Sequence, residues 1–329
     1  EIYTLSLHDA LPISTSCIMT AAILLIENIL AACIRMAAPL TIAGLGEALS
    51  ERAGILNLGL EAIMLCGAFA SFITTFFTDS LALGISAGIL AGAVIAMIHA
   101  LLCIRFRANQ TIVGLALNFF ALGLTGFLFL LSFGRSSVLP QCSTVQSFPL
   151  PLLSRIPFLG TVLFSHNIFV YLTMVLIFVF LLLYRKTEWG VIITAVGEHP
   201  RAADTAGLNV YRVRYAACLA NGVLGGLAGA YFTLAQLGFF MEDITRGKGY
   251  MAIVAVILGR REPVRIFLSA LIIGFADAIQ FQLQTMNIPI PSQAFSILPY
   301  IAAVFVLLFS AGKNADPAAL GVPYQRGSR

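Results

Sequence analysis

Residues 190–215, GVIITAVGEHPRAADTAGLNVYRVRY, form a polar segment between two long apolar stretches of the chain. We call this segment the polar island. The rest of the sequence is that of a membrane protein, because 59% of the 329 residues are hydrophobic and only 10% are charged. A helix that stays in water beside such stretches does not cross lipid, and we expect it to dock a partner.

The apolar stretches have the length of membrane-spanning helices, about 20 residues each. Apolar residues lie all around these helices, whereas the strands of a membrane barrel alternate. We therefore predict an all-α fold, a polytopic transmembrane helical bundle with about 9 (8 to 10) spans. The expected spans are residues 22–46, 55–77, 81–104, 111–133, 167–184, 214–237, 249–259, 264–284 and 296–311.

Two of these spans carry further signals. In 214–237 the pairs Gly222 with Gly226 and Gly225 with Gly229 are small residues four apart, which permits close helix crossings. The stretch 247–263 is interrupted by Gly and Pro and is short for a span, so we expect a half-helix or re-entrant element near the transport pathway.

The Lys and Arg residues indicate the orientation. If the loops listed below, with Arg214 at the start of the next span, share one side with the C-terminal tail, that side holds 14 of the 19 basic residues, and the positive-inside rule places it in the cytoplasm. The loop 134–166 then faces outward. An N-outside topology with nine spans and an N-inside topology with ten both fit this count. The grouped loops are 47–54, 105–110, 185–213 and 260–265.

The chain divides into three parts. Residues 1–18 lack an initiator Met and a basic signal-peptide region, so we expect them to be non-native or disordered, with Met19 as the start. Residues 19–312 form the transmembrane domain, and its loop 185–213 contains the polar island. Residues 313–329 form a cytoplasmic C-terminal tail.

No motif for catalysis, metal binding or phosphate binding is found. The six Cys and four His residues are scattered without metal-ligand spacing, so we expect no metal site, no catalytic residue and no enzyme. The Gly-Lys pairs in RGKGY and AGKNA lack the pattern of a phosphate-binding loop. This chain is expected to bind no cofactor, and any ATP binds to a partner subunit. The net charge of +4 follows from the positive-inside bias, so no nucleic-acid partner is expected.

Within the polar island, Pro200 suits the first position of a helix and Gly207 suits the left-handed residue after its end. The predicted helix covers Arg201–Ala206, and Ala202, Ala203 and Ala206 share one face of small residues. That smooth face would let a partner approach closely. The alternative is an ordinary interfacial connector.

Three motifs occur in the order GEALSERAGILNLGLEAIMLCGAF, AVGEHPRAADTAGLNVYRVRY and RGKGYMAIVAVILGRREPV. Together they resemble the permease subunits of bacterial ABC importers, in the family of branched-chain amino acid, ribose and nucleoside permeases. The resemblance extends over about residues 40–312 and is closest to the nucleoside, or simple sugar, permeases. It implies a type II-like ABC importer permease in the bacterial inner membrane.

The resemblance also implies partners and site residues. The partners would be an ATP-binding ABC subunit, a second permease subunit in a homo- or heterodimer, an extracytoplasmic solute-binding protein and membrane lipid. The polar island would contain the coupling helix that docks into the ATP-binding subunit. The implied coupling residues are Glu198, Pro200, Arg201, Ala202, Ala203, Ala206 and Gly207.

Polar side chains inside the spans are costly in lipid and usually face the bundle interior or a water-filled path. By spacing, Asn57 and Glu61 share one face with Met64, and Asn118 shares a face with other small or polar residues. Asp277, Gln280 and Gln284 form a third polar stripe. We interpret these six as candidates for the solute pathway. Interhelical hydrogen bonding is the alternative, and it is favoured for Glu61.

Apart from Arg35, and from Arg214 and Arg265 at span ends, the spans contain no Lys or Arg that would attract an anionic solute. This favours an uncharged polar solute, a nucleoside or a simple sugar, which the resemblance also implies. The alternatives are a branched-chain amino acid permease and an ion-coupled secondary transporter.

Overall fold

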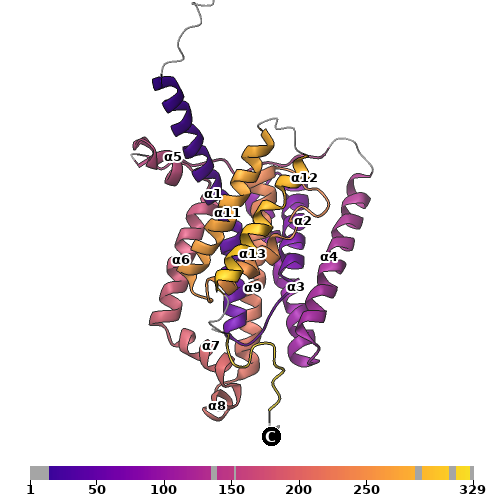
Figure 1. The fold of residues 1–329 in the computed structure, drawn as a ribbon. Helices are drawn as coiled ribbons and strands as arrows, with labels where there is room; N and C mark the ends of the chain where they lie inside the picture. Colours follow the sequence, from indigo (N-terminus) through magenta and orange to yellow (C-terminus); the bar gives the residue numbers. More distant parts are fainter. Residues whose placement is uncertain (1–14, 135–138, 152, 286–290, 311–315, 327–329) are drawn as a thin grey trace, which may run out of the picture.

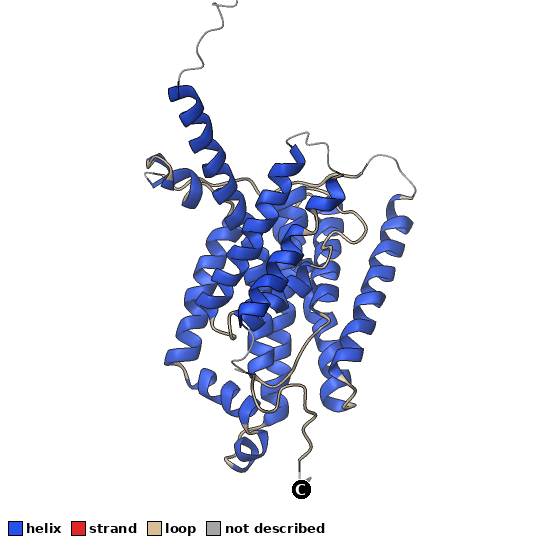
Figure 2. Cartoon of the chain, in the orientation of Figure 1, coloured by secondary structure: helices blue, strands red, loops and turns tan. Residues whose placement is uncertain are grey.

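The computed structural model describes residues 15–134, 139–151, 153–285, 291–310 and 316–326. In these ranges the chain is a bundle of helices that run along a common direction, with no β-strand beyond two isolated bridges (Figures 1 and 2). The short helix α8 and the C-terminal tail lie at one end of the bundle, and α5 and α12 lie at the other (Figure 1). We call these the α8 end and the α5 end.

Among the described residues, seven helices are long and apolar enough to cross a membrane. The all-α prediction is confirmed, whereas the count of about nine spans is not. The seven are α1 (Thr15–Arg52), α2 (Leu60–Thr78), α3 (Leu81–Ala100) with its π-helical extension η2 (Leu101–Arg105), α4 (Gln110–Phe133), α6 (Ile168–Lys186), α9 (Val210–Tyr231) with its π-helical extension η4 (Phe232–Leu237), and α11 (Pro263–Thr285).

The difference in count lies in two short helices. α10 (Lys248–Leu258) and α13 (Leu298–Ser310) occupy the expected spans 249–259 and 296–311, but they contain 11 and 13 residues. At 1.5 Å per residue they are about 16 and 20 Å long, too short for about 30 Å of hydrocarbon. The remaining elements are η3 (Leu153–Arg155), α5 (Leu159–Leu163), α7 (Glu188–Glu198), α8 (Pro200–Thr205) and α12 (Ser292–Phe295).

At the N-terminus, residues 1–14 lie outside the described residues, and α1 begins at Thr15, before Met19. At the other end of α1 the chain leaves the helix after Arg52 and returns to helix only at Leu60. The expected span 55–77 therefore starts five residues late.

The core of the bundle is α9, which is buried along most of its length and packs against α1, α2 and α3. Its small residues permit this packing. A Cβ atom at Gly226 would lie 2.4 Å from the carbonyl oxygen of Gly88 in α3, so a side chain there would push the two helices apart. The close helix crossings predicted from the glycine pairs are confirmed.

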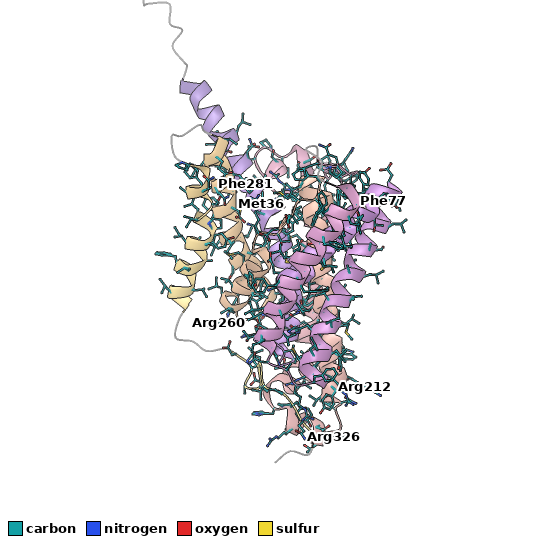
Figure 3. All side chains as sticks on the ribbon, turned by 90° about the vertical axis from the view of Figure 1, so that its right-hand side faces the viewer. Met36, Phe77, Arg212, Arg260, Phe281 and Arg326 are labelled. Carbon is teal, nitrogen blue, oxygen red and sulfur yellow. The ribbon has the colours of Figure 1, made fainter. Side chains whose placement is uncertain are left out.

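The basic segments share one end of the bundle, as predicted. Arg212, Arg260 and Arg326 lie at the α8 end, whereas Phe77 and Phe281 lie toward the α5 end (Figure 3). Direct contacts join the loops: Arg52 pairs with Glu262 at 2.8 Å, and Arg107 Nη1 donates to Gln325 Oε1 at 2.7 Å.

Candidate functional site

The helix predicted in the polar island is α8, and its ends form as the sequence indicates. Pro200 occupies the first turn, where its missing N–H leaves no hydrogen bond unmade. Gly207 follows the helix with φ +90°, a conformation that favours glycine. The Leu208 N–H donates to the carbonyl of Ala203 at 3.0 Å, which closes the C-terminal turn.

α8 exposes only part of its small-residue face. Arg201, Ala202, Ala206 and Gly207 are exposed at the α8 end. Ala203 is only 4% exposed and belongs to the hydrophobic core of the chain itself. The expectation that three alanines face a partner is therefore wrong for Ala203, because α8 needs an apolar anchor to stay on the bundle.

The C-terminal tail, residues 316–326, packs across the α8 end and contacts the island. The Ala319 N–H donates to the Gly197 carbonyl at 2.9 Å, and the Gly321 N–H donates to the Gly54 carbonyl at 3.1 Å. Glu198 Oε2 accepts the N–H of Ala318 at 3.2 Å. The tail thus joins the C-terminus of α7 to the segment that follows α1.

Ion pairs tie the same tail to α8 and to the turn before α11. Arg326 pairs with Asp204 of α8 at 3.2 Å. Asp316 pairs with Arg261 at 2.8 Å, and the buried Arg261 guanidinium also binds Glu51 of α1. α8 is therefore linked through the tail to α1 and to the start of α11.

The second polar region lies inside the bundle, at the N-terminus of α10. The C-terminus of α10 leads to Arg260 at the α8 end, and the helix is only about 16 Å long. Its first residue therefore lies near mid-depth. The expected half-helix is present, and half-helices at this depth line transport pathways in membrane transporters.

Glu61 caps this half-helix. Its carboxylate accepts the N–H of Gly247 at 2.8 Å, the N–H of Gly249 at 2.6 Å and the hydroxyl of Thr245. A Cβ at Gly249 would lie 2.6 Å from the Glu61 Cα, so α2 and α10 meet closely here. These contacts give Glu61 the structural role that the sequence favoured.

Lys248 and Asp277 form an ion pair beside the cap, with side chains 20% and 2% exposed. From the sequence, no Lys or Arg except Arg35 is expected in the interior of the spans. That expectation is wrong for Lys248, which begins α10. The signal that would have found it is a Lys at the first position of a short apolar helix, with an intramembrane Asp to pair with.

A cavity of about 130 Å³ opens beside this ion pair. Of the six candidate pathway residues, Asp277 and Gln280 line it. The other polar lining groups were not predicted, because they come from separate segments of the chain: the loop before α10, the start of α10, the turn before α13 and α13 itself. Those groups are Arg246, Lys248, Ser296 and Tyr300.

The remaining candidates lie apart from the cavity. Asn118 donates to the Tyr250 hydroxyl at 2.6 Å and to the Leu58 carbonyl at 2.9 Å, so it ties α4 to α10 and to the segment before α2. Gln284 is exposed near the end of α11 and does not line the cavity.

Asn57 does not share a helical face with Glu61, because it lies in the irregular segment before α2. Its N–H donates to Glu47 Oε1 at 2.9 Å, inside a buried cluster with Ser50 and Asn221. The predicted polar face of Asn57 and Glu61 is wrong, because α2 begins only at Leu60 and the helical spacing does not apply before it.

Comparison with known proteins places the whole chain among transport components. The family model described as "Branched-chain amino acid transport system / permease component" matches residues 29–307. The chain is 36% identical to the guanosine ABC transporter permease protein NupQ of Bacillus subtilis (strain 168), over 89% of this chain and 95% of that protein.

Two further relatives match over similar lengths. The nucleoside ABC transporter permease protein NupC of Lactococcus lactis is 34% identical, over 87% of this chain and 93% of that protein. The putative glucose ABC transporter permease protein TsgC13 of Haloferax volcanii is 33% identical, over 91% of this chain and 98% of that protein. No solved structure matches the chain significantly.

Proposed function

The chain belongs to the family of permease components of branched-chain amino acid transport systems, and from this premise we propose that it imports a nucleoside or a simple sugar as the permease subunit of an ABC importer. It is a multi-pass membrane transport component rather than an enzyme. The relatives named for guanosine, nucleoside and glucose transport support the solute class.

The observation that argues for an uncharged solute is that Lys248 and the N-terminus of α10, beside the cavity, already have partners. Asp277 neutralises Lys248, and Glu61 occupies the N–H groups at the start of α10. Arg246 also lines the cavity and forms no ion pair among the described residues. A carboxylate solute finds Lys248 and the helix N-terminus already occupied, which disfavours a branched-chain amino acid.

The lining of the cavity suits a solute with hydroxyl groups and a flat ring. Asp277, Gln280 and Ser296 offer hydrogen-bonding groups, and Phe281 and Tyr300 add two aromatic rings. At about 130 Å³ the cavity is smaller than ligand pockets of about 300 Å³ and more. It therefore serves as one wall of the pathway, and a second permease subunit supplies the other.

At the α8 end, α8 acts as the coupling helix in this proposal. The end is basic, which supports a cytoplasmic orientation of α8 and of the C-terminus in the inner membrane. The exposed Arg201, Ala202 and Ala206 would contact the ATP-binding subunit. The tail would carry the motion to α1 and α11 through Asp316 and Arg326. An extracytoplasmic binding protein would deliver the solute at the α5 end.

The test is uptake into proteoliposomes that hold this chain with its ATP-binding, binding-protein and second permease subunits. We expect ATP-dependent uptake of labelled guanosine or glucose that persists when ion gradients are collapsed. Uptake of leucine alone would assign the chain to amino acid transport. Uptake that stops on collapse of the gradient, with ATP present, would indicate an ion-coupled secondary transporter and overturn the proposal.

A further inference from the structure

A pocket of about 300 Å³ lies at the α8 end between η2 and α9, and it shares no lining residue with the α10 cavity. It is lined by Ile104, Arg105, Arg107, Tyr211 and Tyr215. No carboxylate is among these lining residues. Two guanidinium groups therefore share one pocket with two phenol rings, a combination that suits a phosphate group.

The two arginines of the pocket have few partners within the chain. Within the part of the chain that the structure describes, neither Arg105 nor Arg107 forms an ion pair. The one hydrogen bond from these guanidinium groups joins Arg107 to the neutral Gln325. At the same end Arg52, Arg261 and Arg326 each pair with a carboxylate, whereas Arg201, Arg212 and Arg260 also form no ion pair among the described residues. The pocket thus keeps two positive charges that the chain itself does not neutralise.

The wall of the pocket is rigid and apolar below the charged rim. Ile104 packs with Ile55, Ala100 and Cys218 in a small buried cluster, and both tyrosines pack against that cluster. Tyr211 is further held by its hydroxyl, which donates to the Tyr324 carbonyl at 3.4 Å. The two tyrosines are therefore held in place by packing, whereas Arg105 and Arg107 are exposed at the rim.

The surface next to the pocket is apolar on the side that faces the membrane. Leu101 lies one helical turn before Arg105 and is 46% exposed, and Leu219 lies one turn after Tyr215 and is 43% exposed. A ligand with its phosphate in the pocket would lay an apolar tail along these two leucines. Basic pockets between transmembrane helices at the membrane surface bind anionic lipid headgroups.

We propose that this pocket binds the phosphate of an anionic phospholipid, with the acyl chains against Leu101 and Leu219. The lipid holds η2 and the start of α9 together, next to the tail that contacts α8. This assignment is independent of the transported solute, so it stands or fails separately from the importer proposal.

The experiment measures lipid retention by native mass spectrometry on the full chain purified in a neutral detergent. Phosphatidylglycerol and phosphatidylcholine are titrated onto the wild type and onto the double variant Arg105→Gln/Arg107→Gln. We expect one tightly bound phosphatidylglycerol on the wild type and an affinity reduced about 25-fold in the double variant, at about fivefold for each arginine. The control Arg185→Gln/Lys186→Gln removes two exposed cations of α6 at the same end and should bind as the wild type does.

Three results would overturn the proposal. They are equal retention by the double variant, equal retention of phosphatidylcholine, and displacement of the lipid by millimolar inorganic phosphate, which would assign the pocket to a free anion. Thermal unfolding in phosphatidylcholine alone verifies that the variants are folded. If the double variant is not folded, Arg105→Gln alone carries the test with an expected fivefold loss.

Discussion

The α8 end and the N-terminus of α10 are both polar, but they differ in how many of their charged groups have a partner within the chain. At mid-depth Lys248 has Asp277 as its partner, and Glu61 is bound by backbone N–H groups. At the α8 end some cations are paired only at the surface, and Arg105 and Arg107 form no ion pair among the described residues. The difference follows from the solvent, because an uncompensated charge is far more costly in hydrocarbon than at a wet interface.

This comparison predicts that the same kind of substitution has very different effects in the two regions. Changes at the α10 site should strongly lower stability. Changes at the exposed surface of α8 should leave stability unaltered and alter only the contact with a partner. The predictions below run from the largest expected loss of stability to the smallest.

Lys248→Met should be the most damaging change, because it leaves the Asp277 carboxylate buried without a cation. Removal of one member of a buried ion pair costs about 3–5 kcal/mol in the free energy of unfolding. Thermal unfolding of the purified protein measures the loss. The double variant Lys248→Met/Asp277→Leu removes both charges and should regain most of the stability. Wild-type stability of the single variant would mean that the pair contributes nothing.

Glu61→Ala should cost about 2–3 kcal/mol, because the Gly247 and Gly249 N–H groups lose their buried acceptor. Hydrogen exchange should become faster at these two amides. Glu61→Gln keeps one acceptor oxygen and should cost less. Unchanged exchange in Glu61→Ala would show that α10 does not depend on this cap.

Asp316→Ala should cost about 1 kcal/mol or less, because Arg261 keeps its buried partner Glu51 and Asp316 is largely exposed. We expect faster hydrogen exchange confined to the tail residues 316–326. The comparison variant Glu51→Ala leaves the buried Arg261 without its buried partner and should be clearly more destabilising. Equal losses in the two variants would contradict the distinction between exposed and buried pairs.

Ala202→Trp should change stability by less than about 0.5 kcal/mol, because Ala202 is exposed on α8. If α8 docks the ATP-binding subunit, the indole blocks close approach, and ATP-driven uptake should fall to background. Val175→Trp on the exposed face of α6 is the matched control and should transport normally. Full uptake by Ala202→Trp would exclude α8 as the docking helix.

Features that depend on neighbouring residues could be predicted from the sequence. Pro200 and Gly207 define the ends of α8 through their own backbone restrictions. The glycine pairs of α9 predicted close crossings, and the composition predicted a membrane bundle. These inferences need only helical periodicity and the preferences of single residues.

Predictions failed where they depended on the position of a helix end or on contacts between distant segments. The expected span that contains Asn57 starts only at Leu60, so its helical face does not exist at that residue. Ala203 was predicted to face a partner, but α8 packs against the bundle and buries this side chain. The packing of the tail across the α8 end left no sequence signal, because it uses backbone groups such as those of Gly197 and Ala319.

The sequence by itself determined the class of the protein, the end of the bundle that holds the basic residues and the ends of α8. Each of these follows from composition or from contacts within one helical turn. Only the tertiary structure decided that Lys248 pairs with Asp277, that Glu61 caps α10 and that the tail connects α8 to α1 and α11. Those contacts join residues from distant parts of the sequence, and periodicity within one helix carries no information about which helix lies beside it.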